Sequence, residues 1–441
     1  MDVIAEMGKT NAFTMALTGD SLITRKISSY EEHEFLEMID ILRGADVSFT
    51  NLEVLFHHYE SYPAAKSGGT WLRADPALVD DLVWAGFKIV SRANNHCGDY
   101  GVQGMRLTTQ HIESAGLVHA GCGESLDEAR EARFLETSRG RVALVSATAT
   151  FTEHSVAGKS RSNIPARPGL SPLRLATRRI MTPDQLKRLR QVLEEAGLSQ
   201  PEHPERKKSK KRLKVFGKTV FAGESPGIRA EANKQDLSEI VDAVRNAQSL
   251  ADYTIVSIHC HSPGNGVITP PEFLEEFAHH VIDSGADVVV GHGPHMLRGI
   301  EIYKGKPIFY SLGNFLFQHE TVEKLPADNF EKYGFGDRKD MSSEELFDFK
   351  YKDDRRGFPS NAAYWESVVA VIEWMGKEVK DLRLYPVTLG FGKPRGERGR
   401  PMLAKGDIAK DIINNIREIS KPFSTDIEVI NGVGVLKSQE L

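Results

Sequence analysis

The stretch GADVVVGHGPHMLRGIEIYKGKPIFYSLGNFLF, residues 285–317, decides the fold of this chain. Its first part, residues 286–291, is a short apolar run rich in β-branched residues, which is typical of a buried strand. The part that follows has the pattern of a hairpin that turns at Lys304-Gly305. Because His292 and His295 directly follow the first strand, the stretch also places polar side chains at a strand end.

Strand and helix patterns alternate on the N-terminal side of this stretch. Strands are expected at residues 12–20, 45–53, 87–96, 134–149 (two strands joined at Arg139-Gly140) and 253–259. Helices are expected at residues 29–44, 75–87, 104–115, 237–249 and 271–284. Such alternation predicts a layered α/β core in which helices cover the strands.

The patterns divide the chain into four segments. Residues 1–149 and 236–320 are the expected first and second parts of the core, and residues 150–235 an insertion or lid between them. Residues 321–441 are expected to hold an irregular segment, two strands (367–374 and 381–387) and a tail. The insertion contains one expected helix, residues 182–198, and the basic run RKKSKKR at 206–212, which we interpret as a solvated loop rather than an anion site.

Composition excludes several classes of protein. The net charge of −5 and the pI near 6.3 argue against a nucleic-acid binder. Three cysteines without a CxxC pair favour a reducing compartment. Neither a signal peptide nor an apolar run long enough for a membrane span is recognisable, so we expect a cytoplasmic protein without a membrane anchor. The oligomeric state stays open.

Five polar clusters follow expected strands. They are Gly19-Asp20, Asn51-Leu52-Glu53, residues 94–99 (NNHCGD), residues 257–261 (SIHCH) and residues 291–295 (GHGPH). Open α/β sheets bind their ligands at such strand ends, and five polar strand ends together are rare by chance. Imidazole, carboxylate and amide groups are ligands for Mn, Fe or Zn, and with more oxygen for Ca. The sequence therefore predicts one or two divalent metal ions.

These residues carry a resemblance to a known family. The sequences LTGD, ADVSFTNLE, GFKIVSRANNHCGDYG, the strand ending in His259 and the stretch 285–317 resemble the CapA family of poly-γ-glutamate (capsule) synthesis proteins, which is similar to calcineurin-like metallophosphoesterases. The resemblance covers roughly residues 12–320 apart from the insertion. It implies a calcineurin-like two-layer α/β core with mixed sheets. It also implies a set of metal ligands: Asp20, Glu53, Asn95, His96, His259, His292 and His295.

The chain departs from the family pattern at three positions. Leu22 stands where metallophosphoesterases have the histidine of Asp-x-His, and Gly293 stands where CapA proteins commonly have a further histidine. Residues 260–263, CHSP, replace the usual Trp-Gly-x-Glu. Each difference removes a possible ligand or its neighbour, which predicts fewer direct ligands than a full binuclear phosphatase site has.

A site with fewer ligands leaves imidazole and carboxylate groups for proton transfer. We expect His96 and His295 to act as acid–base catalysts with Asp20 and Asp99 as their partners. Two such pairs on opposite sides of a Cα atom could epimerise it, and lasso-peptide epimerases are similar to CapA proteins.

The leading hypothesis is a CapA-like, metal-dependent enzyme, a hydrolase or an isomerase, acting on a peptide or polyglutamate-type substrate. The alternatives are a peptide Cα-epimerase, a metallophosphoesterase and a non-catalytic capsule-assembly component. In the insertion, Arg167 or Arg174 is expected to bind a substrate carboxylate, because guanidinium binds carboxylate bidentately.

Overall fold

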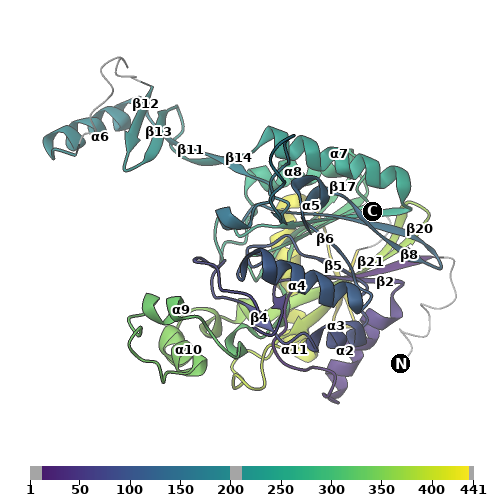
Figure 1. Ribbon diagram of the computed structural model, residues 1–441. Helices are drawn as coiled ribbons and strands as arrows, with labels where there is room; N and C mark the ends of the chain where they lie inside the picture. Colours follow the sequence, from purple (N-terminus) through teal and green to yellow (C-terminus); the bar gives the residue numbers. More distant parts are fainter. Residues whose placement is uncertain (1–11, 199–210, 437–441) are drawn as a thin grey trace.

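Two large β-sheets stack face to face in the computed structural model, which describes residues 12–198 and 211–436 (Figure 1). The ten-stranded sheet has the order β23-β24-β21-β20-β1-β2-β5-β6, with β19 beside β1 and β22 beside β21. Its strands are β1 (Phe13–Leu22), β2 (Val47–Leu52), β5 (Ile89–Ser91), β6 (Val118–Ala120), β19 (Asn314–Phe317), β20 (Glu366–Met375), β21 (Glu378–Thr388), β22 (Met402–Leu403), β23 (Glu428–Ile430) and β24 (Val433–Leu436).

The six-stranded sheet has the order β17-β18-β16-β15-β9-β8. Its strands are β8 (Arg133–Thr137), β9 (Gly140–Thr148), β15 (Tyr253–His259), β16 (Val288–His292), β17 (Leu297–Tyr303) and β18 (Lys306–Leu312). The strands β16, β17 and β18 come from residues 285–317. The strands β17 and β18 form the expected hairpin around Lys304-Gly305. Both sheets contain parallel and antiparallel pairs, so the α/β class with mixed sheets is confirmed.

The core has four layers where the resemblance implied two. Both faces of each sheet are apolar: in β1, Met15 and Leu17 face the other sheet, whereas Ala16 faces the helices. The outer face of the larger sheet packs against α2 (His33–Gly44) and α3 (Leu78–Ala85). The outer face of the smaller sheet packs against α7 (Lys234–Leu250) and α8 (Glu272–Asp283). The helix α11 (Gly406–Ser420) contributes side chains to the apolar layer between the two sheets.

The registers of the parallel strands bring polar residues of both sheets to one edge. Asp20 on β1 is in register with Asn51 on β2 and with Asn314 on β19. On the smaller sheet, His259 at the end of β15 is in register with His292 at the end of β16. Gly19 allows this convergence, because a Cβ atom at that position would lie 1.9 Å from the Gly313 carbonyl oxygen.

The insertion is more ordered than the sequence pattern predicted. Residues 175–232, here called the arm, contain a four-stranded sheet of order β12-β13-β11-β14. The arm consists of β11 (Leu175–Met181), α6 (Pro183–Glu195), β12 (Arg212–Val215), β13 (Lys218–Ala222) and β14 (Gly227–Ala232). The expected helix is α6, and Thr182 and Gln185 form a capping box at its start. Residues 206–210 of the basic run lie outside the described residues.

The arm projects from the body of the molecule instead of covering it. Figure 1 shows β11 and β14 carrying α6, β12 and β13 outward. The preceding residues of the insertion do pack on the core, because β10 (Gly169–Leu170) pairs with β7 (Cys122–Gly123). Residues 169–170 of the insertion, and Leu175, Ala230 and Ala232 at the base of the arm, thus pack on the core, and a lid role for the insertion stays a prediction.

Shorter elements complete the described chain. They are β3 (Leu55–Phe56), β4 (Arg73–Ala74), α4 (Gly101–Ser114), α5 (Leu126–Arg130), α9 (Ala327–Lys332) and α10 (Ser343–Tyr351). The last two order part of the segment that was expected to be irregular. In the described part of the chain, no helix has the length and apolar character needed to cross a membrane.

Candidate metal centre

Histidine and carboxylate side chains converge where the strands of the two sheets end. Within residues 12–198 and 211–436, two sets of three side chains each bring their ligand atoms within 4.8 Å of one another. The first set is Asp20, His259 and His292, and the second is Glu53, His261 and His295. All are buried except His261, which is half-buried. Nitrogen and carboxylate oxygen donors at this density are typical of a transition-metal site.

The first set surrounds the Asp20 carboxylate at the end of β1. Asn51 Nδ2 donates to Asp20 Oδ1 over 2.7 Å. His259 Nδ1 and His292 Nδ1 lie 3.8 and 3.9 Å from the same oxygen, and 3.5 Å from each other. Ser257 Oγ is hydrogen-bonded to His292 Nε2 at 2.8 Å. This leaves His292 Nδ1 as the nitrogen that could bind a metal ion.

The second set surrounds the Glu53 carboxylate, which follows β2. His259 Nε2 lies 3.6 Å from Glu53 Oε1, and His295 Nδ1 lies 4.0 Å from Oε2. His261 Nε2 lies 3.0 Å from His259 Nε2, while its Nδ1 is hydrogen-bonded to Asn265 Oδ1 at 2.7 Å. His259 thus lies between the two sets, with one ring nitrogen facing each.

Glu53 gives the clearest indication that these residues fit a metal ion. The side chain is fully buried, and neither carboxylate oxygen has a hydrogen-bond partner among the described residues. Burial, together with the charges of Asp20 and Asp99, raises the pKa of Glu53 well above its ordinary value. A buried carboxylate without donors costs roughly 1–3 kcal/mol or more. A divalent cation would remove this cost, so the donor set fits a metal.

The protonation states of the other groups also suit metal binding. Burial lowers the pKa of His261 to about 3 and that of His292 to about 4, and it lowers the pKa of His259 well below its ordinary value. These imidazoles are neutral near pH 7 and keep a lone pair for a metal. Burial alone would raise the pKa of Asp20, but the hydrogen bond from His295 and the nearby histidines lower it below its ordinary value.

His96 and Asp99 form a pair beside the second set. His96 Nδ1 lies 2.7 Å from Asp99 Oδ2, and His96 Nε2 lies 3.9 Å from Glu53 Oε1. Asp99 also accepts the backbone N–H groups of Gly68 and Leu72, over 3.1 and 2.8 Å. The carboxylate therefore orients the imidazole, and Nε2 faces the metal ligands. The expected partnership of His96 with Asp99 is present in the structure.

The loop of residues 291–295 is held in an unusual backbone conformation. His295 has a φ of +61°, and Asn314 fixes it by accepting from His295 Nδ1 over 2.9 Å and donating to its carbonyl oxygen over 3.0 Å. Gly293 donates its N–H to Asp20 Oδ2 over 3.1 Å. A Cβ atom on Gly293 would lie 2.9 Å from the Cys260 nitrogen, so this loop excludes the histidine expected from the family pattern.

Most of the residues expected from the sequence lie together. The two sets contain five of the predicted metal ligands: Asp20, Glu53, His259, His292 and His295. Asn95 belongs to neither set, but its buried Oδ1 has no hydrogen-bond partner in the described chain, while Nδ2 donates to the Gly68 carbonyl over 3.2 Å. Asn95 Oδ1 is thus a further oxygen that a metal or substrate could use.

The two arginines expected to bind a substrate carboxylate have internal partners. Arg174 Nε and one of its terminal nitrogens bind both oxygens of Asp236, over 2.8 and 2.7 Å. Arg174 therefore binds a carboxylate bidentately, but that carboxylate is the side chain of Asp236 and not a substrate. Arg167 Nε donates to the Val156 carbonyl over 2.8 Å. A substrate role for these arginines stays a prediction.

His261 was missed as a ligand by the sequence analysis. The departure from Trp-Gly-x-Glu was interpreted as a loss, yet His261 supplies a nitrogen to the second set. Its position two residues after His259, at a strand end, was the available signal. Asn51 and Asn314 were also missed, because each acts through a neighbouring ligand, Asp20 or His295, and such pairing depends on strand register.

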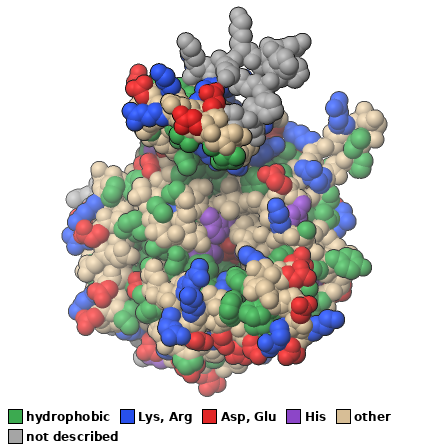
Figure 2. Space-filling model, turned by 90° about the vertical axis from the view of Figure 1, so that its left-hand side faces the viewer, with side chains coloured by type: hydrophobic (Ala, Val, Ile, Leu, Met, Phe, Trp, Pro, Cys, Tyr) green, Lys and Arg blue, Asp and Glu red, His purple; other side chains and the backbone are tan. Residues whose placement is uncertain are grey.

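One face of the molecule is hollowed near its centre (Figure 2). Figure 2 shows histidine side chains in a hollow near the centre of this face, with the arm above it.

Comparison with known proteins identifies the family. The family described as Bacterial capsule synthesis protein PGA_cap matches residues 14–319. The chain belongs to this family. The matched residues include every residue of the two sets.

Individual relatives agree with this assignment. A Sinorhizobium fredii protein named y4sH is 38% identical over 439 residues, which cover 97% of this chain and 93% of its own length. The capsule biosynthesis protein CapA of Bacillus anthracis is 26% identical over 69% of this chain and 59% of its own length. The PGA biosynthesis protein CapA of Bacillus subtilis is 25% identical over 70% of this chain and 64% of its own length.

Proposed function

We propose that the chain is a metal-dependent enzyme with a calcineurin-like core that acts on a peptide or polyglutamate-type substrate. The observation that carries the proposal is the fully buried Glu53 carboxylate, which has no donor among the described residues and has the neutral imidazoles of His259 and His261 nearby. Asp20, His259 and His292 would hold one divalent ion, and Glu53, His261 and His295 a second. Mn, Fe and Zn suit these donors best.

The chain's own residues supply the proton transfer. A bound divalent ion would polarise a substrate carbonyl or lower the pKa of a water molecule. His96 Nδ1–H donates to Asp99, which leaves Nε2 to take or give a proton on the side of Glu53. Asn95 Oδ1 lacks a partner and could accept a hydrogen bond from a substrate amide.

The relatives indicate the class of substrate. Two of them are named for capsule and PGA biosynthesis, so an acidic chain of amide-linked glutamate is the first substrate to test. The cytoplasmic location expected from the sequence stays a prediction.

A peptide epimerase is the second candidate. The observation in its favour is the presence of two imidazole–carboxylate pairs: His96 with Asp99 at 2.7 Å, and His295 Nδ1 at 3.4 Å from Asp20 Oδ2. Such pairs on two sides of a Cα atom could remove a proton and return one to the other face.

Metal content is the first test of the proposal. Elemental mass spectrometry of the purified protein should find Mn, Fe or Zn, with less metal in Asp20→Asn and in Glu53→Gln. His119→Asn is the matched control, because it changes a buried histidine outside both sets. Metal content that is the same in all four proteins would contradict the site.

Substrate assays then separate the functions. Release of glutamate oligomers from poly-γ-glutamate, lost in His96→Ala, supports hydrolysis. Deuterium uptake at Cα without chain cleavage supports the epimerase. Turnover of phosphomonoesters alone would point to a phosphoesterase. Metal binding without any turnover would favour a non-catalytic capsule-assembly component.

A further inference from the structure

The arm carries a charge opposite to that of the remaining chain. Residues 175–232 contain 14 Lys and Arg but 7 Asp and Glu, a formal charge of +7, whereas the whole chain carries −5. The remaining residues therefore carry −12. An acidic partner is repelled by the body and attracted to the arm, because summed charges of this size steer association.

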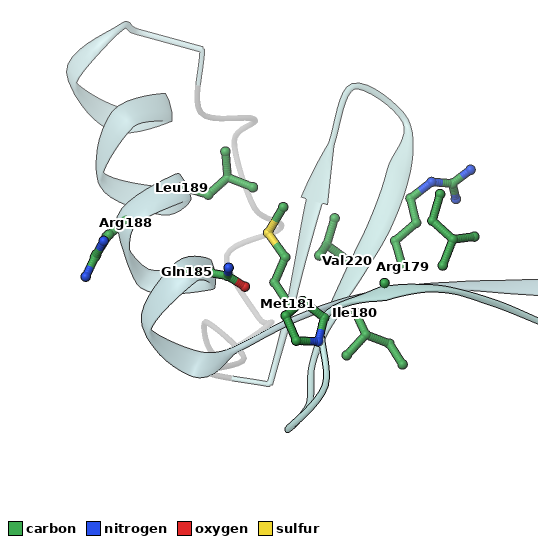
Figure 3. A pocket seen from close by; sticks show the side chains of 10 residues that line it. Arg179, Ile180, Met181, Gln185, Arg188, Leu189 and Val220 are labelled. Atoms are coloured by element: carbon green, nitrogen blue, oxygen red, sulfur yellow. The ribbon is translucent and has the colours of Figure 1, made fainter.

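A groove of about 560 Å³ lies between α6 and the sheet of the arm (Figure 3). Its walls are mainly aliphatic: Met181 comes from β11, Leu189 from α6, Val220 from β13 and Ile228 from β14. Figure 3 shows Leu189 and Met181 facing each other across the groove. The volume is in the range of pockets that bind small ligands or the side chains of a peptide.

Strand register and helix packing explain why the groove is apolar yet open. Arg179 on β11 is in register with Val220 and Ile228, so all three share one face of the sheet. The helix is anchored by Leu186 and Leu193, which are buried. Ile228 is 72% exposed, which leaves an apolar wall in contact with solvent.

Two arginines border the groove with free guanidinium groups. Arg188 on α6 is exposed and Arg179 is half-buried. Neither Arg179 nor Arg188 makes a hydrogen bond or an ion pair with another described residue. In contrast, the adjacent Arg178 forms an ion pair with Glu231 at 3.6 Å. Figure 3 shows Arg179 on the side of the sheet and Arg188 on the outer side of α6, with its guanidinium group directed away from the groove. An apolar groove whose border carries two arginines without partners among the described residues favours a ligand that combines acidic and apolar groups.

We propose that this groove docks an acidic polypeptide segment that inserts apolar side chains between α6 and the sheet. The groove holds an apolar side chain, and Arg179 and Arg188 bind carboxylates flanking it. Among the described residues, the lining contains no aromatic ring on which a nucleic-acid base could stack. Its concave shape does not suit a flat membrane surface. The proposal does not depend on the function of the metal centre.

Fluorescence anisotropy on the full-length protein tests the proposal. The probe is a labelled acidic peptide with leucine at each helical turn, and an all-glutamate peptide of equal length shows what the leucines contribute. We expect saturable binding of the leucine peptide and weaker binding of the all-glutamate one. Arg188→Glu and Ile228→Asp should each raise the Kd about tenfold. Lys218→Glu is the matched control: an exposed charge reversal on the arm, outside the groove lining, that should leave the Kd nearly unchanged.

Other outcomes would overturn the proposal. Equal affinity of wild type, Arg188→Glu and Ile228→Asp for the leucine peptide would exclude the groove. Tighter binding of a DNA oligonucleotide, or of phosphatidylglycerol vesicles, than of the peptide would assign the arm to those ligands. A dimer in light scattering that Ile228→Asp dissociates would assign the groove to a second copy of the chain.

Discussion

His259 Nε2 and His261 Nε2 lie 3.0 Å apart, with the two rings inclined by 61°. Both imidazoles have lowered pKa values, because burial disfavours their charged forms. His261 Nδ1 is already hydrogen-bonded to Asn265, so His261 Nε2 is the nitrogen it can offer to a metal. Two neutral imidazole nitrogens near the same carboxylate, Glu53, are a set of donors that suits a metal ion.

Metal removal should therefore destabilise the protein. We expect a chelator to lower the Tm of the wild type, because a metal that binds the folded state alone stabilises it. His261→Phe keeps an aromatic ring but removes the nitrogen, so its Tm should respond less to the chelator. The measurement is differential scanning calorimetry with and without chelator. In His119→Phe, the chelator should lower the Tm as much as in the wild type. If it also does so in His261→Phe, His261 is not a metal ligand.

Asp99→Asn should impair turnover without releasing metal. Asp99 contacts His96 and two backbone N–H groups but belongs to neither metal set, so its loss disturbs the orientation and charge of the imidazole. The loss of general acid–base catalysis predicts a fall in kcat of about a hundredfold or more. The measurement pairs kinetics with elemental analysis. Loss of metal together with activity would make Asp99 a residue that maintains the metal site.

Acid should destabilise the protein through His119. Burial, with the charges of Arg92 and Arg133, lowers the pKa of His119 from 6.5 to about 3. Between these two pH values the unfolded chain binds more protons at this residue than the folded chain does. Stability therefore falls as the pH drops through this window, by at most about 1.4 kcal/mol per pH unit for one proton.

The His119→Asn variant isolates this contribution. Chemical unfolding of both proteins at several pH values gives the difference in their free energies of unfolding. We expect the wild type to lose more stability than the variant on acidification below pH 6.5. Parallel curves would show that folding does not lower the pKa of His119.

Arg298→Met should stabilise the protein or leave its stability unchanged. Arg298 is fully buried, its Nε donates to the Val267 carbonyl over 3.1 Å, and its two terminal nitrogens have no partner among the described residues. Replacing a buried unpaired charge with an apolar side chain of similar length removes a desolvation cost, and about 1–4 kcal/mol is the range seen for buried ion pairs. Thermal unfolding measures the effect. A large loss of stability would mean that the guanidinium has a partner, such as a bound anion.

Several elements followed from local sequence. The ten residues of β1 are all buried, and their apolar run reports this directly. The polar residues at the ends of β1, β15 and β16 marked the edge of the core that holds the site, because side chains beyond a buried strand emerge at a sheet edge. The helix α6 lies within residues 182–198, where the sequence predicted a helix.

The tertiary structure decided which of these side chains meet. His261 joined the second set, and Arg174 paired with Asp236, because those distances depend on how two sheets stack and where a loop returns. The sheet of the arm also depends on contacts between distant residues, because β11 pairs with β14, which lies far from it in the sequence.

The sequence alone thus determined many strands of the two large sheets, the residue types of the candidate site and the family resemblance. It could not determine the partners of individual side chains, because periodicity reports which face of a strand is buried and carries no information on which strand ends lie together. Contacts between residues as far apart as Asp20 and His292 arise only when both sheets are in place.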